Sequence, residues 1–151
     1  MNKILVEKIS IPEMINILNL PDKYIELQGH KVKIKNDKYL NYLKNGFKCK
    51  NCGVEGIYAN LEYCNKLGNH FNMYANKNGN TVLLTTDHIY PRSKGGLSNI
   101  KNYQVLCSKC NNNKADNSPI TLVEALQKGY ATKKSVEKAV KNHRPAALKD
   151  V

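Results

Sequence analysis

The chain has 151 residues, of which 41% are hydrophobic, and its 24 Lys and Arg residues against 12 Asp and Glu residues give a net charge of +12. This length and apolar fraction are typical of one folded domain and exclude a disordered chain. No apolar run of about 18 residues is present, and the apolar stretch near the N-terminus is too short for a secretory signal. We therefore expect a cytoplasmic protein without a membrane partner.

The N-terminal part of the sequence predicts a small α/β segment. Ser10 is a suitable N-cap for a short amphipathic helix. Residues 23–35 alternate apolar and polar side chains on both sides of Gly29, which is typical of a β-hairpin. Residues 37–43 then predict a short helix that ends at Gly46.

Residues 56–86 predict strands that are separated by turns. The Asn-rich segment 76–80, which contains Gly79, is a strong turn signal. Residues 81–86 are β-branched and apolar, so they predict a strand that runs directly into Asp87. We expect five side chains of this region on one apolar face: Leu61, Tyr63, Phe71, Met73 and Tyr74.

The last third of the chain predicts a loop, a strand and three helices. The Pro- and Gly-containing residues 91–102 predict the loop, residues 103–106 the strand, and residues 108–115 the first helix. A capping box and a terminal Gly delimit a second helix within 121–129. A last, lysine-rich helix is expected over 133–143.

The cysteine spacing predicts a metal site. Four of the five cysteines form two C-x-x-C pairs, a pattern typical of tetrahedral zinc: Cys49 with Cys52, and Cys107 with Cys110. Disulfides would need an oxidising compartment, and a redox role would need only one pair, so both alternatives are weaker. We expect Cys64 to be a buried small hydrophobe rather than a ligand.

The positive charge is concentrated in the second part of the chain. Residues 88–151 hold 12 basic and 4 acidic side chains, whereas residues 1–87 hold 12 and 8. A positive field favours a polyanionic partner, first of all nucleic acid, with the phosphate contacts in the second part. Lysines that simply face water are the alternative interpretation.

Residues 85–114 combine the groups that phosphodiester hydrolysis requires. A histidine at the end of a strand, such as His88, can act as a general base toward water. A divalent cation can polarise the phosphate, and hard cations prefer oxygen ligands such as those of Asp87 and Asn111. Taken alone, however, Asp87 and His88 could be an ordinary dipeptide at the end of a strand.

The joint pattern closely resembles the motif of the HNH endonuclease family. The resemblance rests on residues 86–96 (TDHIYPRSKGG), residues 102–114 (NYQVLCSKCNNNK) and the upstream Cys49 pair, and it covers roughly residues 47–115. It is most similar to zinc-containing, phage-type members, which would place the protein in the host cell cytoplasm. The resemblance implies a ββα-metal fold and metal-dependent cleavage of nucleic acid.

The resemblance also implies a role for each matching residue. His88 would be the general base, Asp87 a ligand of the catalytic metal, and Asn102 the residue that braces the loop. Asn111 replaces the final histidine of many members, but phage junction-resolving relatives use an asparagine there to bind metal, which favours Mg²⁺ or Mn²⁺. We expect five basic side chains to contact nucleic acid: Arg92, Lys94, Lys114, Lys133 and Lys134.

Together these patterns predict an α+β protein with a zinc-held ββα-metal core, a small N-terminal α/β segment and C-terminal helices. The predicted boundaries are 1–46, 47–117 and 118–151. The predicted function is metal-dependent hydrolysis of duplex or branched DNA with structural Zn²⁺ and catalytic Mg²⁺ or Mn²⁺. A homodimer, or two successive nicks, would be needed to cut both strands. The alternatives are a non-catalytic, zinc-containing DNA-binding module and cleavage of RNA.

Overall fold

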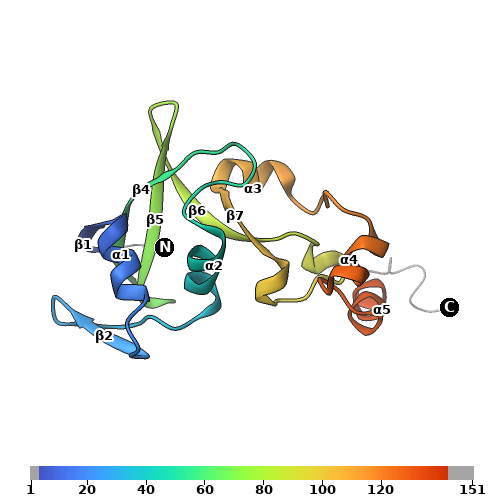
Figure 1. Cartoon of the computed structure of the whole chain (residues 1–151), viewed down its shortest axis with the longest axis horizontal. Coiled ribbons are helices and arrows are strands. Elements are labelled where there is room, and N and C mark those ends of the chain that lie inside the picture. The colour runs from blue at the N-terminus through green and yellow to red at the C-terminus, as the bar shows by residue number, and fades with distance from the viewer. Residues whose placement is uncertain (1–3, 143–151) are drawn as a thin grey trace. The chain divides into compact units, whose positions relative to one another are not determined.

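The computed structural model describes residues 4–142 and has the predicted α+β architecture (Figure 1). The chain forms two compact units, which consist of residues 4–86 with 105–111 and of residues 87–104 with 112–142. The predicted boundaries at residues 46 and 117 stay predictions. No helix among residues 4–142 is long and apolar enough to cross a membrane.

The larger of the two sheets has five strands, with the order β1-β4-β5-β6-β7. Its strands are β1 (Ile4–Ser10), β4 (Gly56–Cys64), β5 (Gly68–Lys77), β6 (Asn80–His88) and β7 (Tyr103–Cys107). Sequence analysis did not predict β1, because its residues are mostly exposed and do not alternate cleanly. This strand exists through antiparallel pairing with β4, more than 45 residues further along the chain.

One face of this sheet carries the main core, but the predicted membership of that face was partly wrong. Leu61 lies opposite Phe71, and both are buried, as is Met73. Tyr74 lies on the other face, where it stacks on Tyr58, since neighbouring residues of a strand point in opposite directions. Tyr63 is 36% exposed and contributes little to the core.

The N-terminal elements follow the sequence signals closely. Helix α1 (Ile11–Leu18) begins after Ser10, whose hydroxyl accepts a hydrogen bond from the Glu13 N–H group. The expected hairpin is the separate two-stranded sheet of β2 (Tyr24–Leu27) and β3 (His30–Lys33). Helix α2 (Asp37–Asn45) ends at Gly46, as predicted.

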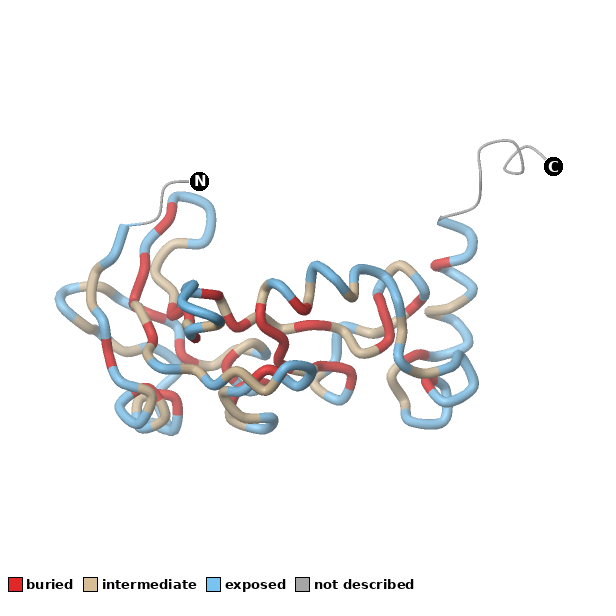
Figure 2. The backbone as a smooth tube through the Cα atoms, turned by 90° about the horizontal axis from the view of Figure 1, so that it is seen from above, coloured by how far each residue is buried: buried red, intermediate tan, exposed pale blue. Residues whose placement is uncertain are grey.

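The second unit begins at the end of β6 and contains mostly short elements. Two 3-10 turns, Arg92–Lys94 and Ile100–Asn102, form the loop before β7. Helix α3 (Ser108–Lys114) follows β7, so the chain order β6, β7, α3 gives the expected ββα succession. Figure 2 shows buried residues mainly along the strands and exposed residues along most of α5.

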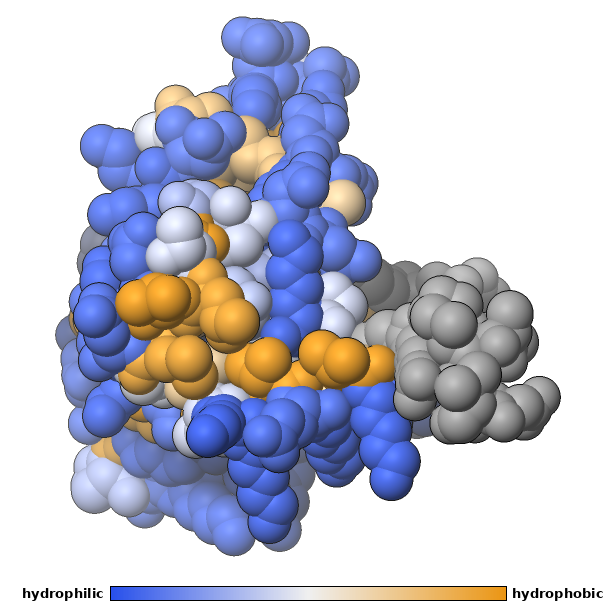
Figure 3. Space-filling view, turned by 90° about the vertical axis from the view of Figure 1, so that its right-hand side faces the viewer, coloured by the Kyte–Doolittle hydropathy of each residue, from blue (hydrophilic) through white to orange (hydrophobic). Residues whose placement is uncertain are grey.

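The last two helices expose both apolar and basic side chains. Helix α4 (Leu122–Lys128) begins with the predicted capping box. Helix α5 is described over Lys133–Asn142, and its predicted end at residue 143 lies outside the described residues. Each helix buries one alanine. Figure 3 shows an apolar patch that is bordered by hydrophilic residues on the face that it views. The exposed large apolar side chains of the two helices are Leu122, Val123, Leu126 and Val140.

Candidate active site and metal centre

His88 is the last residue of β6 and is held from two sides. Its Nε2 atom lies 3.1 Å from the hydroxyl oxygen of Ser98, in the loop before β7. The His88 ring also packs edge to face against the Tyr103 ring, with the two ring centroids 5.1 Å apart. These contacts fix the orientation of the imidazole, which a general base needs in order to face its water.

The surroundings of His88 favour the neutral form of its imidazole. Burial disfavours the charged form and lowers the pKa of His88 below its usual value, and the nearby positive charges of Arg92 and Lys114 act in the same direction. The negative charge of Asp87 opposes this shift. A neutral imidazole has a nitrogen lone pair that can accept a proton at neutral pH.

Asp87 is a nearly buried carboxylate with two polar partners. Its side chain is on the opposite side of β6 from that of His88, since successive residues of a strand alternate. Its Oδ2 atom accepts a hydrogen bond of 3.0 Å from the amide nitrogen of Gln104 and lies 3.2 Å from the ammonium of Lys114. Neither partner was predicted from the sequence, because only pairing within the fold brings them to Asp87.

Lys114 connects the two residues of the Asp87–His88 pair. Besides its ion pair with Asp87, its ammonium donates a 2.9 Å hydrogen bond to the main-chain carbonyl of His88. Its side chain is only 14% exposed. Lys114 therefore lies beside the Asp87 carboxylate and is not a freely exposed surface residue.

Asn102 holds the loop that follows His88. Its side-chain oxygen accepts from the N–H group of Tyr90, and its amide nitrogen donates to the carbonyls of Tyr90 and Leu97, at 2.8 to 3.0 Å. Gly96 allows the same loop to close tightly, because a Cβ atom there would lie 1.7 Å from the carbonyl oxygen of Tyr90. These hydrogen bonds are those expected of a side chain that braces the loop.

We expect Asn102→Ala to lower the free energy of unfolding by about 2–4 kcal/mol. The substitution leaves several buried main-chain groups without partners, and each such group costs about 1–3 kcal/mol. Urea denaturation followed by circular dichroism measures the change. Asn112→Ala, at an exposed position of α3, is the matched control. Equal stability of the two variants would contradict the bracing role of Asn102.

Asn111 lies in the first turn of α3. Its amide nitrogen donates a 2.9 Å hydrogen bond to the hydroxyl of Thr85, which in turn donates to the carbonyl of Leu106 at 2.7 Å. This chain of hydrogen bonds orients the amide group. The role of Asn111 as a metal ligand stays a prediction from the sequence.

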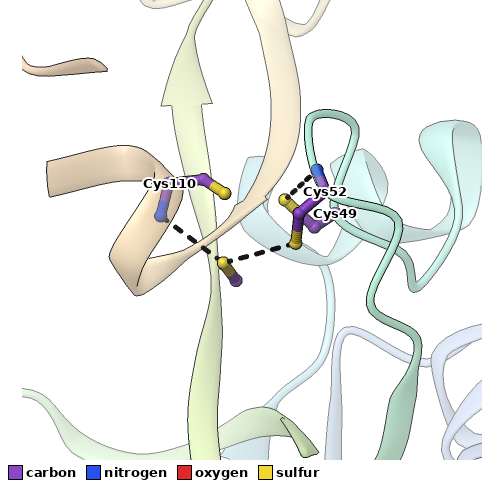
Figure 4. A group of neighbouring side chains, drawn as sticks. Cys49, Cys52 and Cys110 are labelled. Carbon is purple, nitrogen blue, oxygen red and sulfur yellow. Dashed lines mark hydrogen bonds between the residues drawn. The ribbon is translucent and has the colours of Figure 1, made fainter. Parts of the chain in front are cut away.

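The four cysteines of the two C-x-x-C pairs come together as a group that could hold a metal ion such as zinc (Figure 4). Their sulfur atoms all lie within 4.8 Å of one another, and those of Cys52 and Cys107 are 3.9 Å apart. Zinc–sulfur bonds of about 2.3 Å at tetrahedral angles place sulfur atoms about 3.8 Å apart, so the group fits zinc. Cys64 is buried outside this group, as predicted.

Main-chain N–H groups point at the sulfur atoms in both pairs. The N–H group of Cys52 lies 3.5 Å from the sulfur of Cys49, and that of Cys110 lies 3.4 Å from the sulfur of Cys107. Gly53 closes the first turn with a positive φ of 80°. Such N–H contacts favour the thiolate forms, which are the forms that bind metal, whereas burial raises the pKa of Cys107 to about 11.

Two polar side chains that the sequence did not single out touch the cysteine group. The Asn51 amide nitrogen lies 3.3 Å from the Cys110 sulfur and lowers the pKa of that thiol. The Lys77 ammonium, at the end of β5, lies 3.5 Å from the same sulfur and 3.8 Å from that of Cys107. Contact with the Cys52 thiol, and with the other two, holds the pKa of Lys77 above its usual range.

We expect Lys77→Met to weaken zinc binding by about 10-fold, since hydrogen bonds to metal ligands typically contribute 10- to 100-fold to affinity. Four thiolates around Zn²⁺ would carry excess negative charge, which the ammonium would offset. Competition with a chromogenic chelator measures the affinity. Lys66→Met, at an exposed position between β4 and β5, is the control. If both variants retained zinc as the unsubstituted protein does, Lys77 would have no part in the site.

The remaining basic residues of the prediction lie on the surface. Arg92 and Lys94 are exposed in the loop after His88, and Lys133 and Lys134 are exposed in the first turn of α5. All four belong to the second unit. Their charges are therefore accessible to a polyanion.

A comparison with protein-family models matches residues 73–126 to the family described as HNH endonuclease. The match extends from β5 into α4 and contains Asp87, His88, Asn102 and the second cysteine pair. No curated protein and no solved structure matches the chain. The family indicates a nuclease-type function directed at nucleic acid, and the resemblance seen in the sequence is confirmed. The similarity to the HNH endonuclease family thus covers residues 73–126 of this chain.

Proposed function

We propose that the protein is a metal-dependent endonuclease that hydrolyses phosphodiester bonds of DNA. The observation that carries this proposal is the arrangement at the end of β6, within the segment of the HNH family. There His88, oriented by Ser98, adjoins the nearly buried carboxylate of Asp87, and Asn102 holds the following loop. A structural module without catalysis would not need an imidazole that is positioned beside a carboxylate in this way.

His88 accepts a proton from a water molecule while the oxygen of that water forms a bond to the scissile phosphorus. The bond between phosphorus and the 3′ oxygen breaks, the 3′ oxygen leaves as an alkoxide that takes a proton from solvent water, and His88 later releases its proton to solvent. The product strand therefore carries a 5′ phosphate. Ser98 and Tyr103 hold the imidazole ring in place during this step.

The donor set suits a hard divalent cation. Asp87 supplies a carboxylate oxygen, and Asn111 would supply an amide oxygen, both of which Mg²⁺ or Mn²⁺ accepts as ligands. A bound cation of this kind would neutralise charge on the phosphate and on the leaving oxygen. Lys114, 3.2 Å from Asp87, adds a fixed positive charge at the same carboxylate.

The cysteine group would hold Zn²⁺ in a structural role. All four ligands are thiolates, so no position remains open for water or substrate, which distinguishes structural from catalytic zinc sites. Through this ion the turn after α2 would be joined to the start of α3. The zinc site would thereby support the element that carries Asn111.

Exposed basic side chains would hold the DNA through its phosphates. Arg92, Lys94, Lys133 and Lys134 are accessible to a strand, and such contacts make binding strongly dependent on salt. One active site cuts one strand. Cutting both strands would need a homodimer or two successive nicks.

A nicking assay on supercoiled plasmid tests the proposal. We expect conversion to the open circular form with added Mg²⁺ or Mn²⁺ and none without added divalent cation. Matched DNA and RNA oligonucleotides, compared in the same buffer, report the preferred substrate. Binding to DNA without metal-dependent cutting would favour the non-catalytic module, and cutting of RNA alone would contradict the DNA assignment.

A further inference from the structure

The hairpin of β2 and β3 has one face that the core does not use. Tyr24 lies opposite Lys33, and Glu26 lies opposite Lys31, so these four side chains share one face. The other face carries Val32, which is fully buried, and Ile25 and Leu27, which pack against the core. The first face is therefore available to a partner without any loss of core packing.

This outer face combines an exposed aromatic ring with positive charges. Tyr24 is 44% exposed, and the Lys31 ammonium lies 4.6 Å from the centre of its ring. Lys23 lies 5.8 Å from the same ring centre, and Lys33 is exposed on the opposite strand. Glu26 is the single acidic residue of the hairpin, so the three lysines give this face a net positive charge.

The hairpin is held in one position on its own unit. The His30 imidazole is hydrogen-bonded to the side-chain oxygen of Asn69 at 3.2 Å, and the Asn69 amide nitrogen donates to the carbonyl of Lys31 at 3.0 Å. Gln28 and Gly29 form the turn with positive φ angles of 49° and 76°, as tight hairpins require. A surface fixed in advance loses little conformational entropy when it binds.

We propose that this outer face of the hairpin, formed by Lys23, Tyr24, Lys31 and Lys33, is a second contact surface for duplex DNA. The inference rests on the proposed function in that the substrate is DNA. A two-stranded ribbon fits the major groove, which is about 12 Å wide. The lysines contact phosphates along the groove, and the Tyr24 ring packs against the sugars and base edges between them. The surface assigns a role in substrate binding to the N-terminal segment.

Equilibrium binding to a 30-base-pair duplex tests this surface, with fluorescence anisotropy measured over a series of salt concentrations. All proteins carry His88→Ala and are assayed without added divalent cation, so that cleavage does not affect the result. We expect Lys31→Gln with Lys33→Gln to reduce the slope of log K against log salt by about 1.8, since each lost phosphate contact contributes about 0.9. Tyr24→Ala should weaken binding at every salt concentration and leave the slope unchanged.

Lys44→Gln, at an exposed position of α2, is the matched control and should leave the slope at its original value. Far-ultraviolet circular dichroism and zinc content establish that each variant is folded. An unchanged slope in the double variant would overturn the proposal, and so would an effect seen only on single-stranded DNA. Because binding is measured without cleavage, a protein that binds through the hairpin but fails to nick plasmid would contradict the proposed function and support this surface.

Discussion

We expect His88→Ala to reduce the rate of plasmid nicking by about 100- to 10,000-fold, which is the usual contribution of a general base. The substitution removes the only group proposed to accept the proton of the attacking water. Neither Ser98 nor Tyr103, the neighbours of the ring, can replace an imidazole in this role, because their hydroxyl groups are far weaker bases near neutral pH. Single-turnover nicking with saturating protein measures the chemical step directly.

The control for this experiment is a histidine outside the proposed site. His70, on β5, is hydrogen-bonded to the carbonyl of Gly68 and lies near Asn72, and His70→Ala should cut at the original rate. Zinc content and the urea midpoint of His88→Ala should also stay unchanged, since the ring is not part of the main core. If His88→Ala nicked as fast as the unsubstituted protein, the assignment of the general base would be wrong.

Cys107→Ser is expected to have the largest effect on stability. Cys107 is fully buried, and its loss leaves zinc with three thiolate ligands. Zinc binding contributes about 10–16 kcal/mol to the folding of small zinc-dependent peptides. We therefore expect Cys107→Ser to lower the free energy of unfolding by about 5 kcal/mol. In a domain of this size that loss lowers the thermal midpoint by roughly 10–20 °C. Differential scanning calorimetry and zinc analysis of the purified protein measure both effects.

Cys64→Ser separates this effect from the general cost of changing a buried cysteine. Cys64 is as buried as Cys49, and its sulfur accepts a hydrogen bond from the N–H group of Leu67, but it lies outside the metal group. We expect this variant to bind one zinc ion and to lose far less stability. Full zinc occupancy and an unchanged midpoint in Cys107→Ser would contradict a structural zinc site at these four residues.

Local signals in the sequence determined most of the elements. Ser10 and the capping box at Thr121 mark helix starts because their side-chain oxygens bond to N–H groups only three residues away. The Asn78-Gly79 turn and the alternation around Gly29 predicted two hairpins for a similar reason. The two C-x-x-C pairs and the Asp87-His88 motif also identified the metal group and the family, because the spacing of such ligands is itself a chemical requirement.

Only the tertiary structure decided which residues meet across the sheet. Strand β1 is stabilised by pairing with β4, and no pattern within its own seven residues predicts that partner. Met73 and Tyr74 are neighbours in β5, so alternation places them on opposite faces, but the sequence did not reveal which of these faces carries the core. Register and pairing depend on contacts between residues that are distant in the chain, and local sequence patterns contain no information about them.

The partners of the functional groups were decided in the same way. Gln104 and Lys114 reach Asp87, and Lys77 and Asn51 reach the Cys110 sulfur, from elements that are separate in the sequence. The sequence by itself predicted the reacting and metal-binding side chains, because their chemistry restricts residue type and spacing. The neighbours that orient them and offset their charge can be of many types, so their identity depends on where the folded chain places them.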